Sequence, residues 1–448
     1  MSQSQATITP IQSLDVFKAR RLRFQQNLPA DGVALFFSAP VRTKSNDVHF
    51  RFRQDSDFYY LTGFDEEESV LVVTPDHARL YLRERDPARE TWDGPRLGVD
   101  DAPAKLGLDE ARPIQAFAKA NELGALLRNS STLYYRFGED AARDARILGA
   151  AHQTMQRSRA GEYGPDTLIN PAGLIAELRL IKDAYDLKLL GECARLTANG
   201  HQALFERTRP GMFEYELEAM LYHEFRRGDG GEGYPSIVAS GPNACVLHHI
   251  NNDRQMQAGD LVLVDAGADK HYMNADVTRT FPVSATYTPE QRDVYAAVLQ
   301  AQNLAIAASR AGVSMQAVHD VTVRDLVQSL IDMQVLGGSV DENIEKKHYQ
   351  HYYMHKTGHY LGMDVHDVGS YYDHNADGPR KLSDGMVCTV EPGLYFAPNT
   401  PHTPERFAGI GVRIEDDVVI NGDTPDVVTS AIPKSVADIE ALRAAALQ

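Results

Sequence analysis

Two stretches of the chain repeat one pattern, in which an apolar strand ends on a carboxylate and glycine follows two residues later. The first, GDLVLVDAG, carries Asp265, and the second, GMVCTVEPG, carries Glu391. Each is followed by another apolar strand with an acid, at Asp276 and at Glu415. The repeat indicates an internal duplication, in which matching strand ends from two halves converge near a pseudo-twofold axis. We therefore expect the four carboxylates to face one another.

The helices between these strands also follow a repeating order. The C-terminal part of the chain is predicted as two helices and a strand pair, followed by two more helices and a strand pair. The third helix begins at Thr288, where Pro289 at the first helical position and Gln291 complete a capping box. The fourth is expected over residues 314–330. Apolar residues at helical spacing define the first two helices: Leu187, Leu190, Ala194, Leu217, Met220, Leu221 and Phe225.

The chain of 448 residues is longer than the roughly 250–300 residues at which single cores stop growing, so two domains are expected. Residues 1–172 mix an amphipathic segment with short apolar strands and are predicted to form an α/β domain. Residues 173–448 form the second domain. The fold class is α/β (α+β), and the strands predicted in the first domain are residues 33–37, 70–73, 80–82 and 133–135.

Four carboxylates at close range cannot all stay ionised unless cations compensate them, because like charges and burial both raise their pKa values. Two divalent cations would balance the charge. Oxygen-rich ligation favours Mn²⁺, Mg²⁺ or Co²⁺, although the ligand types alone do not exclude Zn²⁺.

Histidines supply further candidate ligands and catalytic groups. Of 16 in the chain, His355, His359 and His366 lie within twelve residues. The first two have the i, i+4 spacing of zinc-binding helices, but Gly358 and Gly362 disfavour a helix and no glutamate follows His355. An extended or looped segment that lines a pocket is the better prediction. A second histidine pair, at positions 248 and 249, precedes the first acid-bearing strand.

Composition excludes several classes of partner. The net charge of −17 argues against nucleic acid and anionic membranes. Three widely spaced cysteines support neither a disulfide framework nor a thiolate zinc site. The N-terminal sequence lacks the features of a signal peptide, and no run reaches the ~20 apolar residues that a membrane span needs. A cytoplasmic protein is expected.

These motifs, in this order and spacing, resemble those of the Xaa-Pro aminopeptidases (aminopeptidase P), within the pita-bread metallopeptidases that also include prolidase and creatinase. In the second domain the resemblance runs through residues 246–248, 261–267, 276–282, 354–369, 389–395 and 409–416. In the first domain, residues 37–40 and 59–64 are also similar. The resemblance implies a C-terminal pita-bread catalytic domain.

Site residues follow from the resemblance. It implies two divalent metal ions, usually Mn²⁺, held by Asp265, Asp276, His359, Glu391 and Glu415, with Asp276 and Glu415 bridging. It makes Glu391 the proton shuttle, places His366 at the developing oxyanion and His248 on the leaving-group side, and gives catalytic or pocket-shaping roles to His355, Arg413 and Tyr371. Two interpretations of Trp92 are open. It is a packed or surface aromatic, or it contacts the substrate from the first domain or from a neighbouring subunit.

The implied activity is hydrolysis of the bond between an N-terminal residue and a following proline, on peptide substrates with proline at the second position, by a homodimer or homotetramer. Prolidase, which cleaves only dipeptides, is one alternative. A catalytically inactive peptide-binding or protein-binding relative is another, but such proteins usually lose metal ligands and this chain keeps all five. The same ligands argue against creatinase. At position 356 this chain has lysine where most relatives have glycine. The difference bears on the loop conformation and the substrate preference, and not on the metal ligands.

Overall fold

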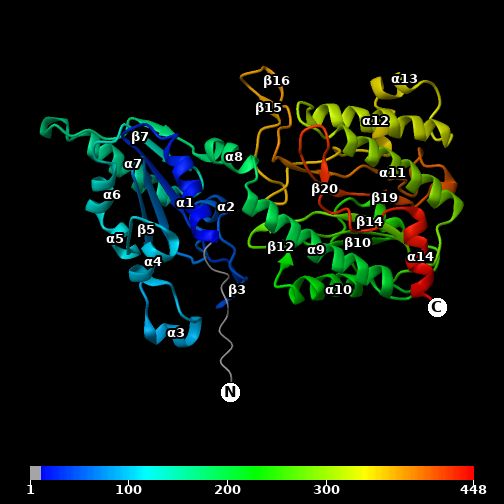
Figure 1. Ribbon diagram of the computed structural model, residues 1–448, viewed down its shortest axis with the longest axis horizontal. Helices are drawn as coiled ribbons and strands as arrows, with labels where there is room; N and C mark the ends of the chain where they lie inside the picture. The colour runs from blue at the N-terminus through cyan, green and yellow to red at the C-terminus, as the bar shows by residue number, and fades with distance from the viewer. Residues whose placement is uncertain (1–11) are drawn as a thin grey trace. The chain divides into compact units, whose positions relative to one another are not determined.

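The computed structural model describes residues 12–448, which divide between Arg179 and Leu180 into two compact units (Figure 1). The division crosses helix α8 (Ala172–Leu180). The domain boundary at residues 172 and 173 lies at the start of this helix and stays a prediction.

A six-stranded mixed sheet organises the first unit, with the strand order β6-β5-β4-β1-β7-β8. The central strands β1 and β4 run antiparallel, whereas β1 and β7 run parallel. All four strands expected from the sequence lie in this sheet. Its strands are β1 (Gly32–Phe37), β4 (Val70–Thr74), β5 (His77–Leu82), β6 (Glu110–Pro113), β7 (Thr132–Tyr135) and β8 (Thr167–Ile169).

Helices cover this sheet because alternate strand residues point to opposite faces and both faces are apolar. Val33 and Leu35 pack with Ile147 in one cluster. Phe36 on the other face meets Phe24 edge-on at 5.3 Å between ring centroids. The other elements of this unit are α1 (Gln12–Gln25), β2 (Thr43–Ser45), β3 (Val48–His49), α2 (Ser56–Thr62), α3 (Pro87–Asp93), α4 (Gly98–Leu106), α5 (Ile114–Ala118), α6 (Ala120–Leu127) and α7 (Ala141–Met155).

The second unit repeats one order of elements, as expected: a helix pair is followed by antiparallel strands, and the order recurs (Figure 1). The first repeat contains α9 (Ala184–Arg207), α10 (Glu214–Arg227), β9 (Gly231–Glu232), β10 (Ile237–Ser240), β11 (Leu261–Asp265), β12 (Ala268–Lys270), β13 (Met273–Asn274) and β14 (Thr278–Pro282). The second contains α11 (Pro289–Ala308), α12 (Met315–Asp332), α13 (Val340–Glu345), β15 (Tyr372–Asp373), β16 (Gly378–Pro379), β17 (Val387–Val390), β18 (Gly393–Tyr395), β19 (Gly411–Arg413), β20 (Asp416–Val419), β21 (Asp426–Val427) and α14 (Val436–Ala446).

Local signals in the sequence set the ends of these helices. The side chain of Thr288 accepts a hydrogen bond from the backbone of Gln291, whose own side chain accepts one from the backbone of Thr288. This confirms the predicted capping box. Ser314 caps α12 in the same way through the backbone N–H of Ala317.

A core of aliphatic and aromatic side chains joins the helices of the second unit to its strands. Leu217, Leu221 and Phe225 of α10 are fully buried in it, as their spacing predicts. Among the helices of residues 12–448, none combines the length and the apolar composition of a membrane span.

Candidate metal centre

The four acids of the duplicated motif stand at equivalent places in the two strand pairs. In one repeat, Asp265 ends β11 and Asp276 comes shortly before β14, with β11 and β14 paired antiparallel. In the other, Glu391 directly follows β17 and Glu415 directly precedes β20, again an antiparallel pair. Antiparallel pairing brings the end of one strand beside the start of the other, so each pair places two carboxylates together.

Glycines of the motif and of the histidine-bearing loop allow the chain to approach closely behind these acids. A Cβ atom on Gly267 would lie 1.6 Å from the carbonyl oxygen of Ala275, and one on Gly358 would lie 1.9 Å from that of Thr389. Gly393 is enclosed in the same way by Tyr395 and the backbone of Val412. Any larger residue would push these segments apart and displace the carboxylates beside them.

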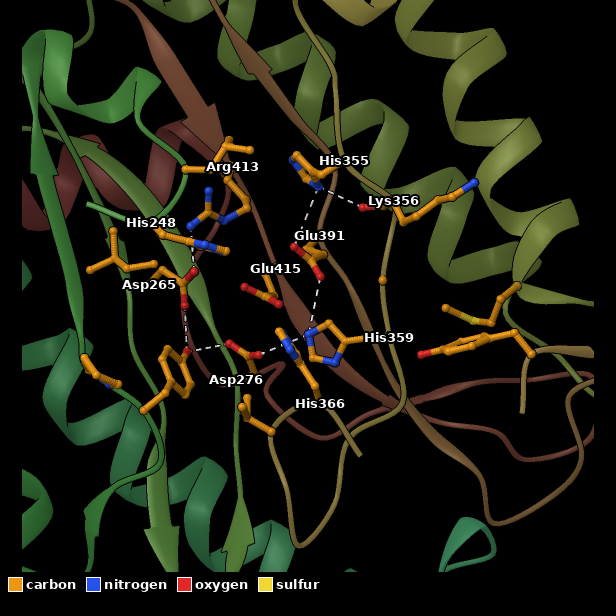
Figure 2. A pocket seen from close by; sticks show the side chains of 18 of the residues that line it. His248, Asp265, Asp276, His355, Lys356, His359, His366, Glu391, Arg413 and Glu415 are labelled. Carbon is orange, nitrogen blue, oxygen red and sulfur yellow. Dashed lines mark hydrogen bonds and ion pairs between the residues drawn. The ribbon is translucent and has the colours of Figure 1, made fainter. Parts of the chain in front are cut away.

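All four acids line one pocket of about 830 Å³ in the second unit, and Figure 2 shows them directed toward one another. Ligand atoms of Asp276, His359 and Glu415 lie within 4.8 Å of one another. His359 Nε2 is 3.4 Å from Asp276 Oδ2 and 3.5 Å from Glu391 Oε1. The phenol oxygen of Tyr234 lies within hydrogen-bonding distance of both Asp265 and Asp276.

Burial makes this concentration of negative charge unfavourable. Burial raises the pKa of Asp276, and the neighbouring Asp265 adds to the rise. Burial raises the pKa of Glu415 well above its ordinary value, and Asp276 and Glu391 raise it further. Burial raises the pKa of Glu391 to about 7, against the opposing effect of His359. Arg413 pairs with Asp265 at 2.6 Å but leaves the other acids without a permanent cation.

The donor set fits divalent cations for two reasons. Carboxylate oxygens are the ligands that hard divalent ions prefer, and such ions would neutralise acids that are otherwise costly to bury. His359 Nδ1 lies 3.0 Å from the carbonyl oxygen of Tyr360, so it carries the hydrogen and donates. Burial lowers the pKa of His359, but Asp276 and Glu391 raise it to about 9, so Nε2 carries a proton toward the carboxylates in the metal-free protein. A bound ion would take the place of that proton, as in a histidine ligand held by a hydrogen bond from its other nitrogen.

A hydrogen-bonded chain runs along the wall of the pocket from Arg413 to His355. The guanidinium of Arg413 donates to Tyr395 Oη at 3.0 Å, and that oxygen lies 2.9 Å from His355 Nε2. His355 Nδ1 lies 2.8 Å from the carbonyl oxygen of Lys356, so Nδ1 donates and Nε2 accepts from Tyr395. Burial and Arg413 lower the pKa of His355 to about 3, which keeps the ring neutral.

The remaining candidate residues of the second unit also line the pocket: His248, His366 and Tyr371. The rings of His359 and His366 meet edge-on at 4.3 Å. Burial lowers the pKa of His366, and His359 and His248 lower it further. Tyr371 stacks on Tyr360 at 4.4 Å. Residues 355–366 contain no helix, which confirms the looped segment expected from the glycines.

Lys356 and Trp92 are two further residues that the sequence singles out. Lys356 is exposed at the pocket lining, and Figure 2 shows its side chain directed away from the carboxylates. Trp92 lies on α3 of the first unit and is 87 % exposed. Every residue that lines the pocket belongs to the second unit, so the role of Trp92 in substrate binding stays a prediction.

Sequence reasoning missed three residues that orient the acids. Tyr234 bonds to two of them, Tyr395 links Arg413 to His355, and Thr278 donates to Glu415 Oε2 at 2.6 Å. Tyr395 and Thr278 lie within the recognised motifs, so proximity to the acids was an available signal. Tyr234 is distant from them in sequence and offered none.

The chain is similar to known proteins in both units. Residues 188–422 match metallopeptidase family M24, and residues 17–134 match the N-terminal domain of aminopeptidase P. The chain is 41 % identical to the Xaa-Pro aminopeptidase of Escherichia coli (strain K12), over 96 % of this chain and 98 % of that protein. The chain belongs to metallopeptidase family M24.

Solved structures of M24 proteins share the whole fold. The aminopeptidase PepP of Pseudomonas aeruginosa matches with a TM-score of 0.93 at 40 % identity, over 96 % of this chain and 98 % of that one. Zn-substituted Escherichia coli aminopeptidase P in complex with product matches with a TM-score of 0.92 at 39 % identity, over 96 % and 98 %. The second unit is therefore a pita-bread domain, as the sequence motifs predicted.

Proposed function

We propose that this M24 protein is a metal-dependent aminopeptidase that hydrolyses the bond between the first residue of a peptide and a proline at the second position. The observation that carries the proposal is the convergence of three buried carboxylates, of the half-buried Glu391 and of His359 in one pocket. Further support is the 41 % identity, over almost the full length of this chain, to an Xaa-Pro aminopeptidase.

The proposed ligands are Asp265, Asp276, His359, Glu391 and Glu415, which would hold two divalent ions between the two repeats. Such ions act as Lewis acids and lower the pKa of a bound water toward 7, which provides a nucleophile at neutral pH. We propose Mn²⁺ as the physiological metal, because oxygen ligands predominate. The Zn-substituted relative indicates that a related site accepts zinc.

The side chains around the acids carry the proton transfers in this proposal. Glu391 would accept a proton from the attacking water and return it to the proline nitrogen as the bond breaks, a role open to a carboxylate that lies beside the nucleophile. His366 donates a hydrogen bond to the carbonyl oxygen as negative charge develops. His248 serves the leaving-group side. Each such contact is typically worth a few kcal/mol in the transition state.

Selection of proline follows from the pocket wall. The Xaa-Pro bond has no N–H, so its recognition needs a surface for the ring and no acceptor for a hydrogen. Both ring nitrogens of His355 are occupied by Lys356 and Tyr395. With Tyr371, His355 therefore offers ring surface without an unsatisfied acceptor. Apolar side chains complete the lining: Leu247, Ile250, Met315 and Val365.

The protein is further proposed to act in the cytoplasm as a homodimer or homotetramer. Its three cysteines are all unpaired, which suits a reducing compartment. Trp92 exposes 87 % of its surface, and tryptophan is enriched at protein interfaces. In this proposal, a neighbouring subunit brings the Trp92 side chain to the substrate.

A peptide assay tests the activity. Purified protein with Mn²⁺ is incubated with an Xaa-Pro-Xaa tripeptide, an Xaa-Pro dipeptide and an Xaa-Ala-Xaa tripeptide, and released residues are quantified. We expect cleavage of the proline tripeptide and little cleavage of its alanine counterpart. Exclusive dipeptide cleavage would replace the proposal with prolidase, and no cleavage of any proline peptide would refute it.

A further inference from the structure

A second cluster of titratable side chains lies outside the pocket lining, at Glu214, His249 and Asp253. Glu214 is the first residue of α10 and its side chain is fully buried. Its Oε1 accepts from both the backbone nitrogen and the hydroxyl of Ser240, at 2.6 and 2.7 Å. Its Oε2 accepts from the backbone nitrogen of Arg254 at 3.0 Å.

Two side chains complete this arrangement. Asn243 Nδ2 lies 3.1 Å from Oε1 of Glu214, and His249 Nε2 lies 3.0 Å from Oε2. A carboxylate has about four lone-pair sites. Donors from the chain itself thus saturate Glu214, so the cluster is a structural anchor and not a second metal site.

These donors belong to one segment, residues 240–254: Ser240 and Asn243 lie near its start, His249 in its middle and Arg254 at its end. The backbone N–H of Glu214 also donates to the carbonyl oxygen of Arg254 at 3.0 Å, which strengthens the attachment at the far end. Beyond the short 3₁₀ turn Gly241–Cys245, the segment has no helix. Its shape depends on these anchors together with Asn252, which accepts from the backbone N–H of Val238 and donates to the carbonyl oxygen of Ser236. Between the anchors lie three residues that line the pocket, Leu247, His248 and Ile250.

His248 has no anchor of its own. Its side chain is exposed and forms no hydrogen bond or ion pair with any of the described residues. Its place in the pocket is therefore set by the backbone on either side of it. His249, its neighbour, instead points to Glu214 and fixes that backbone.

We propose that Glu214 is the positioning residue for His248: a buried carboxylate outside the pocket holds both ends of residues 240–254 and so sets where His248 meets the substrate. The inference rests on the proposed function, in which His248 serves the leaving-group side. It also explains why the chain carries two adjacent histidines, since one faces the pocket and the other faces the anchor.

The first test replaces Glu214 with glutamine. The variant Glu214→Gln keeps the size of the side chain, but its NH₂ group faces N–H donors, so at least one donor of Ser240, His249 or Arg254 loses its acceptor. We expect kcat on an Xaa-Pro-Xaa tripeptide to fall at least about tenfold, with KM changed less. Bound metal should be unchanged, because Glu214 contacts none of the proposed ligands. Full kcat in this variant would overturn the inference.

A double-mutant cycle separates positioning from general damage. If Glu214 acts through His248, the double variant Glu214→Gln/His248→Ala should be no slower than His248→Ala, within about twofold. A further tenfold loss in the double variant would show that Glu214 acts elsewhere. The control is Glu224→Gln, which changes another buried acid of α10 that pairs with Arg227. We expect it to keep the wild-type kcat.

A crystal structure of Glu214→Gln gives a readout that needs no activity, and so distinguishes failure of this inference from failure of the proposed function. Residues 246–250 should be displaced while the five proposed ligands stay in place. An unmoved His248 would overturn the inference even if the enzyme cleaved no proline peptide. If Glu214→Gln does not fold, Glu214→Asp keeps the charge on a shorter side chain and should show the same displacement.

Discussion

Glu391 is proposed both as a metal ligand and as the group that transfers the proton. Replacement by glutamine keeps its shape and removes its charge, so both a metal ligand and the proton acceptor are lost. We expect Glu391→Gln to lower kcat at least about a hundredfold on an Xaa-Pro-Xaa tripeptide, the typical contribution of a general base. The control is Glu405→Gln, at an exposed acid. Activity of Glu391→Gln within tenfold of wild type would remove Glu391 from the proposed site.

The charge of Lys356 is predicted to affect substrate preference. It is the exposed cation among the pocket-lining residues, and its side chain points away from the acids (Figure 2). We propose that a charge there acts on the part of a substrate that follows proline. We expect Lys356→Glu to lower kcat/KM for a tripeptide with a free C-terminal carboxylate by about threefold to fivefold, because exposed ion pairs contribute up to ~1 kcal/mol.

The same peptide with a C-terminal amide is the control substrate for Lys356, and its kcat/KM should change less than twofold. Lys346→Glu, at an exposed lysine that pairs with Glu342, should affect neither peptide. Equal losses on the acid and the amide would contradict an electrostatic role for Lys356.

Much of the site could be predicted from single residues. The acids and His359 occur in motifs whose spacing identifies them, and the structure brings them into one pocket. Tyr234 could not be found in this way, because its role arises from a loop that approaches Asp265 and Asp276 only in three dimensions. The hydrogen on His359 Nδ1 was equally hidden, since it depends on the carbonyl oxygen of Tyr360.

Among the helices and strands, those with a strong periodic pattern are predicted from the sequence, and the shortest strands are not. The capping box at Thr288 and the apolar stripe of α10 match the structure. Two-residue strands such as β13 and β15 were not expected, because so short a segment shows no alternation of apolar and polar residues. These strands are set by the backbone partners that they meet, which no local pattern records.

The pocket loop gives a prediction about pH at this scale. His319 of α12 lies 2.9 Å from the buried hydroxyl of Thr357, which Tyr353 also bonds. Burial and the nearby Lys356 lower the pKa of His319 to about 4. The His319 ring therefore binds fewer protons in the folded protein than in the unfolded chain between pH 6.5 and about 4, so its contribution to stability falls as pH falls through this window.

We expect His319→Gln in metal-free protein to lose less stability than wild type between pH 6.5 and 4, as measured by urea unfolding at several pH values. His374→Gln, at an exposed histidine, is the control and should follow wild type. Parallel pH profiles for wild type and His319→Gln would contradict this assignment.

At the scale of the whole molecule, the acids that hold metal should destabilise the protein without it. Burial and Asp265 raise the pKa of Asp276, which means that its charged form is penalised in the metal-free fold. Asp276→Asn should therefore raise the Tm of metal-free protein at pH 7, and lower it relative to wild type when Mn²⁺ is saturating. A metal-free Tm below that of wild type would contradict the electrostatic account.

The duplicated architecture explains why four acids lie together in one site. Each repeat places two acids at neighbouring strand ends, and ions between the repeats would offset the charge that Arg413 leaves on the remaining acids. The measurement that tests this claim most directly is the metal content of purified protein, determined together with its peptidase activity before and after chelation. We predict about two divalent ions per chain, loss of Xaa-Pro cleavage on chelation and its return with Mn²⁺. Undiminished cleavage by metal-free protein would contradict the account.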